Sequence, residues 1–391
     1  MDTIEKRRLI LLYMLFFTYA LTTSVVGTFM VDLLNDFQME VSTGGIFTVF
    51  QYIGCMAGVF LSGFILNRYR KKELCLATFG LLTVLLLAMS KINRLGFFLL
   101  LLFLMGMTSK SLDMIVNTTI SMQHEEKKGM YINLLHGCFG AGSVLGPLLA
   151  AWMLKISLSW QTVYGCFGAG SAALLALFAV FYSDAEEKPV QGQAEKKMDF
   201  TVMREPGMYA LMLALFCYCG HQCGINTWVP LFLQYRFGVS LFVGSVGTSV
   251  FWIALVIGRL ACARLALHVK EETLLGGGLI LAALLHLAGI LVPHIAASMA
   301  GYAAAGLFAG AAIPLILTLG YQSCPDRQSS VSVVLFLCIS LGQAVFPWVM
   351  GLICDAAGLV WGMLSNAACL LGACLFVRLY RSKVKSREII C

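Results

Sequence analysis

Three polar residues lie inside a strongly apolar stretch of this 391-residue sequence. Lys110, Asp113 and Asn117 all fall within 96–121, at spacings of three, four and seven residues. On an α-helix these spacings place the three side chains on one face. A charge at the centre of a bilayer costs about 3 kcal/mol or more, so we expect the lysine and the carboxylate to face a polar interior and to be paired.

Two interpretations of this pair remain open. In the favoured one, Asp113 carries a proton during function, and Lys110 keeps the carboxylate ionised until a solute or a proton breaks the pair. In the other, Lys110 and Asp113 form a permanent ion pair that only neutralises both charges. Lys110 also leaves room for an anionic substrate, because an unpaired cation inside the membrane would attract a carboxylate.

Further hydrogen-bonding groups occur in two other apolar stretches. Asn133 and His136 are one helical turn apart in 129–154, where they could bind a solute. A histidine in an apolar helix is also commonly a core residue, and we weigh the two interpretations equally.

A second polar and aromatic set lies in 207–233. Amide and imidazole groups beside an aromatic ring suit a solute with hydroxyl groups and an apolar face, such as a sugar. Trp228 could instead anchor the helix at the membrane surface. The set consists of His221, Gln222, Asn226 and Trp228.

The elements that must position these residues are transmembrane helices. Only 12% of the residues are charged, 59% are hydrophobic and the mean hydropathy is +0.85, which favours lipid as the solvent. About 20 apolar residues cross the hydrocarbon core as a helix. Stretches of that length predict an all-α membrane protein with twelve spans: 9–31, 43–66, 74–91, 96–121, 129–154, 160–183, 207–233, 241–264, 273–293, 297–320, 328–351 and 357–380.

The positive charges predict the orientation of these spans. With the amino terminus in the cytoplasm, 22 of the 27 Lys and Arg residues fall on the cytoplasmic side, and only Lys91, Arg94, Lys155 and Arg236 fall outside. By the positive-inside rule, both termini are cytoplasmic and the chain is a multi-pass protein of the cytoplasmic membrane. The net charge of +7 is therefore explained by orientation and not by a nucleic-acid partner.

The chain divides into two similar halves. A charged segment, 184–206, separates six spans in 1–183 from six in 207–391, and we interpret it as a cytoplasmic linker. Gly106 recurs at an offset of 200 residues as Gly306, and so does the pair Gly142 and Pro147. Two parallel six-helix repeats predict a solute site between the halves, near the middle of the membrane.

The loop after the second span carries a motif. Residues 63–72 read G-F-I-L-N-R-Y-R-K-K and resemble the G-x-x-x-D-R-x-G-R-R signature of the major facilitator superfamily, whose loop gates the cytoplasmic side. The resemblance implies gating roles for Gly63, Asn67, Arg68, Arg70 and Lys71. Asn67 replaces the acid of the signature and Arg70 its second glycine, which weakens the electrostatic latch.

Other motifs resemble the fucose-proton symporter branch of that superfamily. These are the acid and asparagine Asp113 and Asn117, the N-L-L-H-G-C-F-G segment from Asn133, and Y-C-G-H-Q from Tyr218 followed by Trp228. The resemblance implies that Asp113 carries the proton. Gln222 stands where the branch has an acid, so a second carboxylate for coupling is missing.

The sequence thus predicts a proton-coupled transporter of a small polar solute, such as a monosaccharide. A proton-coupled efflux antiporter for amphipathic compounds is the alternative, favoured by Gly142, Gly146 and Pro147 in the fifth span, by the missing second acid, and by the abundance of Met, Phe and Cys. A membrane sensor is disfavoured because no signalling domain is attached. The sequence has no GxSxG, P-loop or HExxH motif and no metal-type CxxC pair, so we expect no enzyme activity, no metal and no cofactor besides the proton gradient. We expect a monomer in the lipid bilayer.

Overall fold

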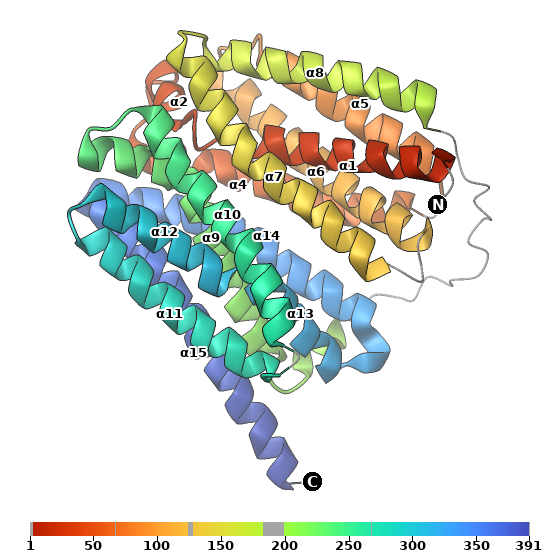
Figure 1. Ribbon diagram of the computed structural model, residues 1–391, viewed down its shortest axis with the longest axis vertical. Coiled ribbons are helices and arrows are strands. Elements are labelled where there is room, and N and C mark those ends of the chain that lie inside the picture. The colour runs from red at the N-terminus through yellow and green to blue at the C-terminus, as the bar shows by residue number, and fades with distance from the viewer. Residues whose placement is uncertain (1–2, 67, 124–127, 183–198, 267, 391) are drawn as a thin grey trace. The chain divides into compact units, whose positions relative to one another are not determined.

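The computed structural model describes residues 3–66, 68–123, 128–182, 199–266 and 268–390, and within these ranges all regular elements are helices (Figure 1). The chain forms two compact units, described here one at a time. The first contains Met1–Met39 and Phe50–Glu195, and the second contains Glu40–Val49 and Lys196–Cys391. The all-helical fold class is as predicted.

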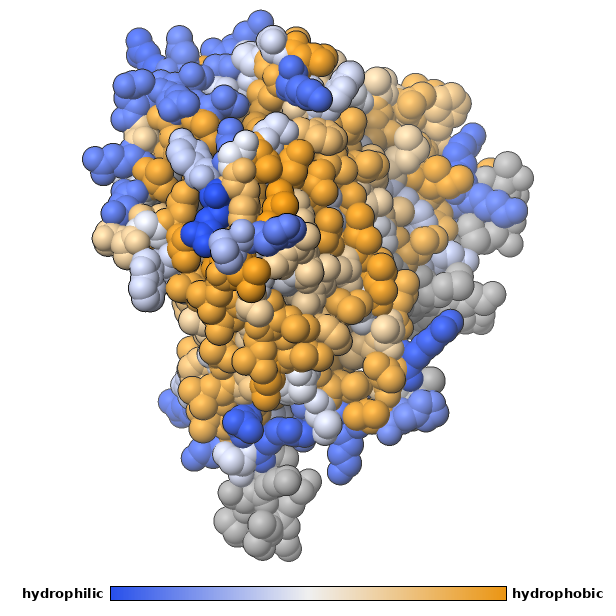
Figure 2. All heavy atoms as spheres, turned by 60° about the vertical axis from the view of Figure 1, so that its left-hand side comes forward, coloured by the Kyte–Doolittle hydropathy of each residue, from blue (hydrophilic) through white to orange (hydrophobic). Residues whose placement is uncertain are grey.

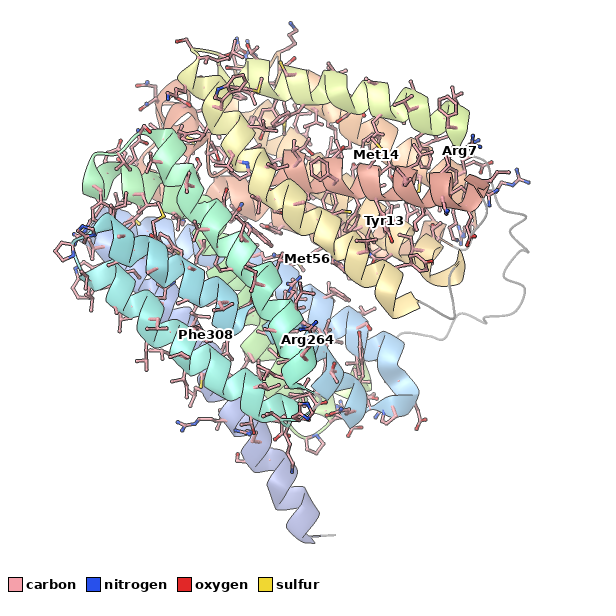
Figure 3. The ribbon with its side chains drawn as sticks, in the orientation of Figure 1. Arg7, Tyr13, Met14, Met56, Arg264 and Phe308 are labelled. Atoms are coloured by element: carbon pink, nitrogen blue, oxygen red, sulfur yellow. The ribbon has the colours of Figure 1, made fainter. Side chains whose placement is uncertain are left out.

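The first unit is built on long apolar helices. Hydrogen bonds within each helix satisfy the backbone, as an apolar solvent requires. The helices are α1 (Thr3–Thr23), α2 (Met30–Asp36), α4 (Ile46–Ile65, which begins in the second unit), α5 (Lys71–Met89), α6 (Leu95–Gln123), α7 (Lys128–Lys155) and α8 (Trp160–Phe181). Figure 3 labels Tyr13 on α1, whose hydroxyl donates to the Tyr131 carbonyl of α7 at 3.1 Å.

The second unit follows the same plan. Its helices are α3 (Val41–Gly44), η2 (Phe200–Arg204), α9 (Met208–Phe237), α10 (Leu241–Leu265), α11 (Glu271–Leu291), α12 (Ile295–Ala309), α13 (Ala312–Ser323), η3 (Pro325–Arg327), α14 (Gln328–Ala357) and α15 (Leu359–Ile390). Helix α9 is the most buried of the membrane-length helices and packs against α10, α14 and α15.

Ten helical segments among the described residues are long and apolar enough to cross a membrane. Most of the face visible in Figure 2 is correspondingly hydrophobic, with hydrophilic residues gathered toward its margins. The two remaining predicted spans correspond to α1, which begins with a charged turn, and α4, whose described apolar part covers only Ile46–Ser62. The chain is a multi-pass helical membrane protein, and the count of twelve stays a prediction.

The predicted span over 297–320 lies within one of these ten segments, Ile295–Ser323, but there the chain breaks between α12 and α13. Pro314 has no N–H with which to bond the Gly310 carbonyl four residues earlier. Arg259 of α10 donates its Nε–H to that carbonyl instead, at 2.9 Å. A side chain from another helix thus replaces the missing backbone bond.

The first predicted span, 9–31, is also interrupted, because α1 ends at Thr23. The hydroxyl of Thr22 donates to the Thr18 carbonyl at 2.9 Å, and that of Thr23 donates to the Tyr19 carbonyl at 2.8 Å. Such bonds compete with the helical pattern and weaken the last turn.

Glycines bring α4 and α6 into backbone contact. A β-carbon at Gly106 would lie 1.8 Å from the Gln51 carbonyl oxygen, and one at Gly54 would lie 1.9 Å from that of Phe103. Neither position admits a side chain without moving a helix. This contact fixes α6, which carries the central polar residues.

The same contact recurs in the second unit, between α10 and α12. A β-carbon at Gly306 would lie 2.3 Å from the Phe251 carbonyl oxygen, and one at Gly258 would lie 2.0 Å from that of Leu307. Gly306 and Phe251 are each 200 residues beyond Gly106 and Gln51. The offset seen in the sequence is therefore also an offset in helix packing.

The segment interpreted as a linker, 184–206, is described only from residue 199. There Arg327 contacts three side chains of this segment. Its guanidinium lies 3.2 Å from the Asp199 carboxylate and 3.1 Å from the Thr201 hydroxyl, and it forms an ion pair with Glu205. Hydrogen bonds from Thr201, and then the Arg327 charge, lower the pKa of the Asp199 carboxyl below its ordinary 3.8. This cluster holds η2 against the start of α14.

We predict that acid loosens this cluster. Because the pKa of Asp199 is lower in the folded chain, its contribution to stability is present above pH 3.8 and is lost as the pH falls through the folded-state pKa. Thermal unfolding followed against pH should show this loss in the wild type and not in Asp199→Asn. Asp326→Asn, at an exposed neighbour, is the control. Identical acid profiles for the wild type and Asp199→Asn would contradict the assignment.

We predict that Gly106→Ala destabilises the protein by about 1–3 kcal/mol, because the added methyl group forces α4 and α6 apart. Gly170→Ala is the matched control, since no atom lies within 4 Å of the corresponding position in α8. Thermal unfolding of the purified protein in detergent measures both. Equal midpoints for the two variants would show that the backbone contact contributes nothing.

Candidate functional site

Helix α6 brings three predicted site residues together. Lys110 Nζ lies 2.6 Å from Asp113 Oδ2, and the Asn117 amide donates to Asp113 Oδ1 at 2.7 Å. The side chains of Lys110 and Asp113 are 18% and 17% exposed. The carboxylate thus accepts on both oxygens, from a cation on one side and an amide on the other. This arrangement can hold a charge on a carboxylate that remains partly exposed.

Helices α4 and α1 surround this face. Gly58 of α4 makes room for the lysine, because a β-carbon there would lie 3.2 Å from Lys110 Cβ. The hydroxyl of Ser111 donates to the Gly58 carbonyl at 3.3 Å. Tyr19 of α1 lies within electrostatic range of Asp113. The close helix contact therefore sets where the charged residues stand.

Helices α1 and α7 form an aromatic cluster in the same unit. The ring centroid of Phe16 lies 5.9 Å from that of His136 and 5.8 Å from that of Phe139, and Tyr19 is 5.5 Å from Phe139. His136 is nonetheless exposed. Its imidazole thus combines an aromatic neighbour with open surface, as solute binding would require. Asn133 lies on α7, but its side chain is outside the described residues.

The predicted set on α9 lies deep in the second unit. His221 and Gln222 are buried, and His221 Nδ1 lies 3.3 Å from the Asn366 carbonyl of α15. The Asn366 amide donates back to the His221 carbonyl at 2.9 Å. Gly224 leaves the space that Asn366 occupies, because a β-carbon there would lie 2.3 Å from its Nδ2.

Trp228 and Asn226 are held by other helices. The Trp228 indole is fully buried and donates to the Pro347 carbonyl of α14 at 2.9 Å. Asn226 Oδ1 accepts from the Trp252 indole of α10 at 3.4 Å. The buried indole of Trp228 therefore packs between α9 and α14.

The loop predicted to gate the cytoplasmic side is only partly described. Gly63 lies in α4, Asn67 is outside the described residues, and Arg68 and Arg70 are exposed. Lys71 is buried instead, and its ammonium donates to the Leu66 carbonyl at 2.5 Å. Lys71 therefore satisfies a backbone oxygen at the end of α4.

The glycines of the fifth predicted span serve packing. A β-carbon at Gly142 would lie 2.4 Å from the Phe17 carbonyl oxygen, and one at Gly146 would lie 2.3 Å from that of Leu21. These contacts fix α7 against α1.

The sequence reasoning did not single out Asn366 or His286. His286 is buried in α11, 5.3 Å between ring centroids from His221. An ionisable residue inside an apolar span itself indicates a functional site, so this pattern could have identified His286 as a candidate. Asn366 had no such signal, because its partners are 145 residues away. The described residues contain no group of three or more His, Cys, Asp or Glu that could hold a metal ion.

Comparisons with known proteins agree with this architecture. The family model of the Major Facilitator Superfamily matches residues 12–275. A protein TsgA homolog of Erwinia tasmaniensis is 28% identical over 363 residues, covering 90% of each chain. Protein TsgA of Shigella flexneri is 26% identical over 368 residues, with the same coverage.

Solved structures of similar fold include two transporters. An inward-facing bacterial homolog of the human lysosomal transporter Spinster has a TM-score of 0.81 at 15% identity, covering 98% of each chain. The Escherichia coli fucose:proton symporter FucP has a TM-score of 0.63 at 17% identity, covering 95% of this chain and 98% of its own. At these identities the likeness concerns the fold.

We predict that Lys110 and Asp113 depend on each other. Lys110→Met and Asp113→Asn should each destabilise the protein, because each leaves a partly buried charge without its partner. The double variant should be about 1 kcal/mol more stable than the sum of the two single effects predicts, a coupling energy at the upper end for exposed ion pairs. Thermal unfolding of all four proteins measures the cycle. Additive effects would show that the two charges do not stabilise each other.

Proposed function

The chain belongs to the Major Facilitator Superfamily, a family of membrane transporters rather than enzymes, and we propose that it moves a small polar solute across the cytoplasmic membrane by proton-coupled alternating access. The family accounts for a multi-pass protein that binds a small solute within a lipid bilayer. We propose the class of solute, the coupling to protons and the location in the cytoplasmic membrane.

The chain of hydrogen bonds on α6 carries the proposal. Asp113 is placed to bind a proton, because its carboxylate is partly exposed yet held between Lys110 and Asn117. Protonation removes its charge and so frees Lys110 from the ion pair. The freed cation and the neutral acid then offer different hydrogen bonds to a solute. Proton binding and solute binding would be coupled through this exchange of partners.

The side chains proposed to bind solute suit a polyhydroxylated molecule such as a monosaccharide. They combine amides, imidazoles and an aromatic ring, which together can bond hydroxyl groups and cover an apolar sugar face. FucP, which shares the fold, is a fucose:proton symporter. The proposed groups are Asn117, Asn133, His136, His221, Gln222, Asn226 and Trp228.

The proposed topology follows from the charges and the repeat. Twelve spans form six-helix halves at 1–183 and 207–391, joined by the linker 184–206, with both termini in the cytoplasm. The chain acts as a monomer, uses the proton gradient and needs no cofactor. The proposed gating residues are Gly63, Asn67, Arg68, Arg70 and Lys71.

A proton-coupled efflux antiporter for amphipathic compounds is the second candidate. Its sequence support is the glycine motif of α7, the missing second acid and the abundance of Met, Phe and Cys. Gly142 and Gly146 also pack closely on α1. Transport of a small polar solute stays our leading proposal, because the hydrogen-bonding groups around Asp113 suit such a solute.

Transport by purified protein in proteoliposomes tests the proposal. An imposed pH gradient should drive accumulation of a radiolabelled monosaccharide from a panel that includes fucose. Outward transport of an amphipathic dye, with no sugar accumulated, would support the antiporter instead.

In the same assay, Asp113→Asn should reduce gradient-driven accumulation by at least about tenfold, because an amide cannot take up and release the proton. Exchange of labelled for unlabelled solute without a gradient should persist, since that process needs no net proton movement. Asp326→Asn, the same change at an exposed position, is the matched control. Undiminished coupled transport in Asp113→Asn would exclude Asp113 as the proton carrier.

A further inference from the structure

A buried polar cluster lies inside the second unit, where α9, α10, α11 and α12 pack together. The imidazoles of His221 and His286 are 0% and 1% exposed, with ring centroids 5.3 Å apart and planes inclined by 67°. The ring centroid of Tyr302 of α12 lies 5.6 Å from that of His286, and the ring centroid of Tyr218 lies 6.4 Å from that of His221. Figure 1 shows α11 and α12, which bring His286 and Tyr302 together, side by side.

Most polar atoms of this cluster lack a hydrogen-bond partner among the described residues. These atoms are His221 Nε2, both ring nitrogens of His286, and the hydroxyls of Tyr218 and Tyr302. Each buried unsatisfied group costs about 1–3 kcal/mol. Lipid offers no compensating hydrogen bond. A cluster of such groups therefore indicates that something else binds there.

The repeat shows that packing does not require these polar residues. Helices α5 and α11 begin at Lys71 and Glu271, so His286 corresponds to Leu86 of the first unit. By the same offset Tyr302 corresponds to Leu102 of α6. Both leucines are fully buried. Apolar side chains thus fill these positions in one half of the chain, and the polar ones serve another purpose in the other half.

The surroundings favour a proton over a metal ion. Among the described residues, Asn366 bonds His221 and the two imidazoles face each other. No described carboxylate interacts with either ring. Phe251 of α10 packs on His221, and Arg259 and Cys219 act on Tyr218. Two imidazoles without a third ligand do not complete a site for zinc or another transition metal. Two imidazoles can, however, share one proton through a bridging water that bonds a ring nitrogen of each.

We propose that His221 and His286 form a proton-binding site that holds one proton between the two imidazoles through a buried water. The tyrosine hydroxyls of Tyr218 and Tyr302 complete its hydrogen bonds. Proton binding at this pair stands independently of transport. Its use as the coupling group that replaces the carboxylate missing at Gln222 rests on the proposed function.

Nitrogen NMR of the histidine rings tests the proposal directly. The full chain is labelled with ¹⁵N-histidine in lipid nanodiscs and treated with a chelator. His124, His136, His268 and His294 are replaced by Gln, so that only the two rings give signals. A titration over about pH 4 to 9 covers the ordinary ionisation range of histidine. We expect uptake of one proton by the pair, with both rings changing together.

Two variants keep the result decisive. His286→Leu places the residue of the first unit at this position, and His221 should then no longer take up the proton in the same range. Tyr302→Phe keeps both rings and removes one hydroxyl, and should shift the shared titration without abolishing it. Rings that stay neutral throughout the range, or a His221 titration unchanged in His286→Leu, would overturn the proposal. The readout needs no transport, so a failed transport assay would leave this test intact.

Discussion

Polar groups inside an apolar helix bundle must find their partners within the protein, because lipid supplies none. The structure meets this requirement with side chains that bond groups on other helices or on their own helix. Arg259 bonds the Gly310 carbonyl left open by Pro314, and the Trp228 indole bonds the Pro347 carbonyl. On α6, Lys110 and Asn117 both bond Asp113. At His286, whose ring nitrogens have no hydrogen-bond partner among the described residues, we propose a shared proton.

Close backbone contact is the second condition, because it decides which side chains can meet. Gly106 and Gly306 each let one helix pass against a carbonyl of its neighbour, in α4 and α10 respectively. The positions are 200 residues apart and make the same kind of contact in each unit. The repeat therefore concerns packing more than chemistry, since the polar residues differ between the halves. Lys110 itself corresponds to Gly310, the site of the helix break.

Much of the helix content could be predicted, because about 20 apolar residues in a row are sufficient to indicate a spanning helix. The α6 face could be predicted for the same local reason, since Lys110, Asp113 and Asn117 are spaced by helical turns. The break at Gly310 could not, although Pro314 was visible. Pro147 and Pro347 stay inside unbroken helices, so proline alone does not decide the outcome. The pairing of His221 with Asn366 joins residues far apart in sequence, which local patterns do not reveal.

The central claim is that the Asp113 carboxyl gains and loses a proton as the protein works. Infrared difference spectroscopy of protein labelled with ¹³C-aspartate, before and after a pH step or solute addition, measures this directly. The claim predicts a carboxylic acid band that appears as the carboxylate band falls, and that is absent from Asp113→Asn. A carboxylate that stays ionised at every pH, with and without solute, would contradict it and leave the ion pair with Lys110 as a purely structural feature.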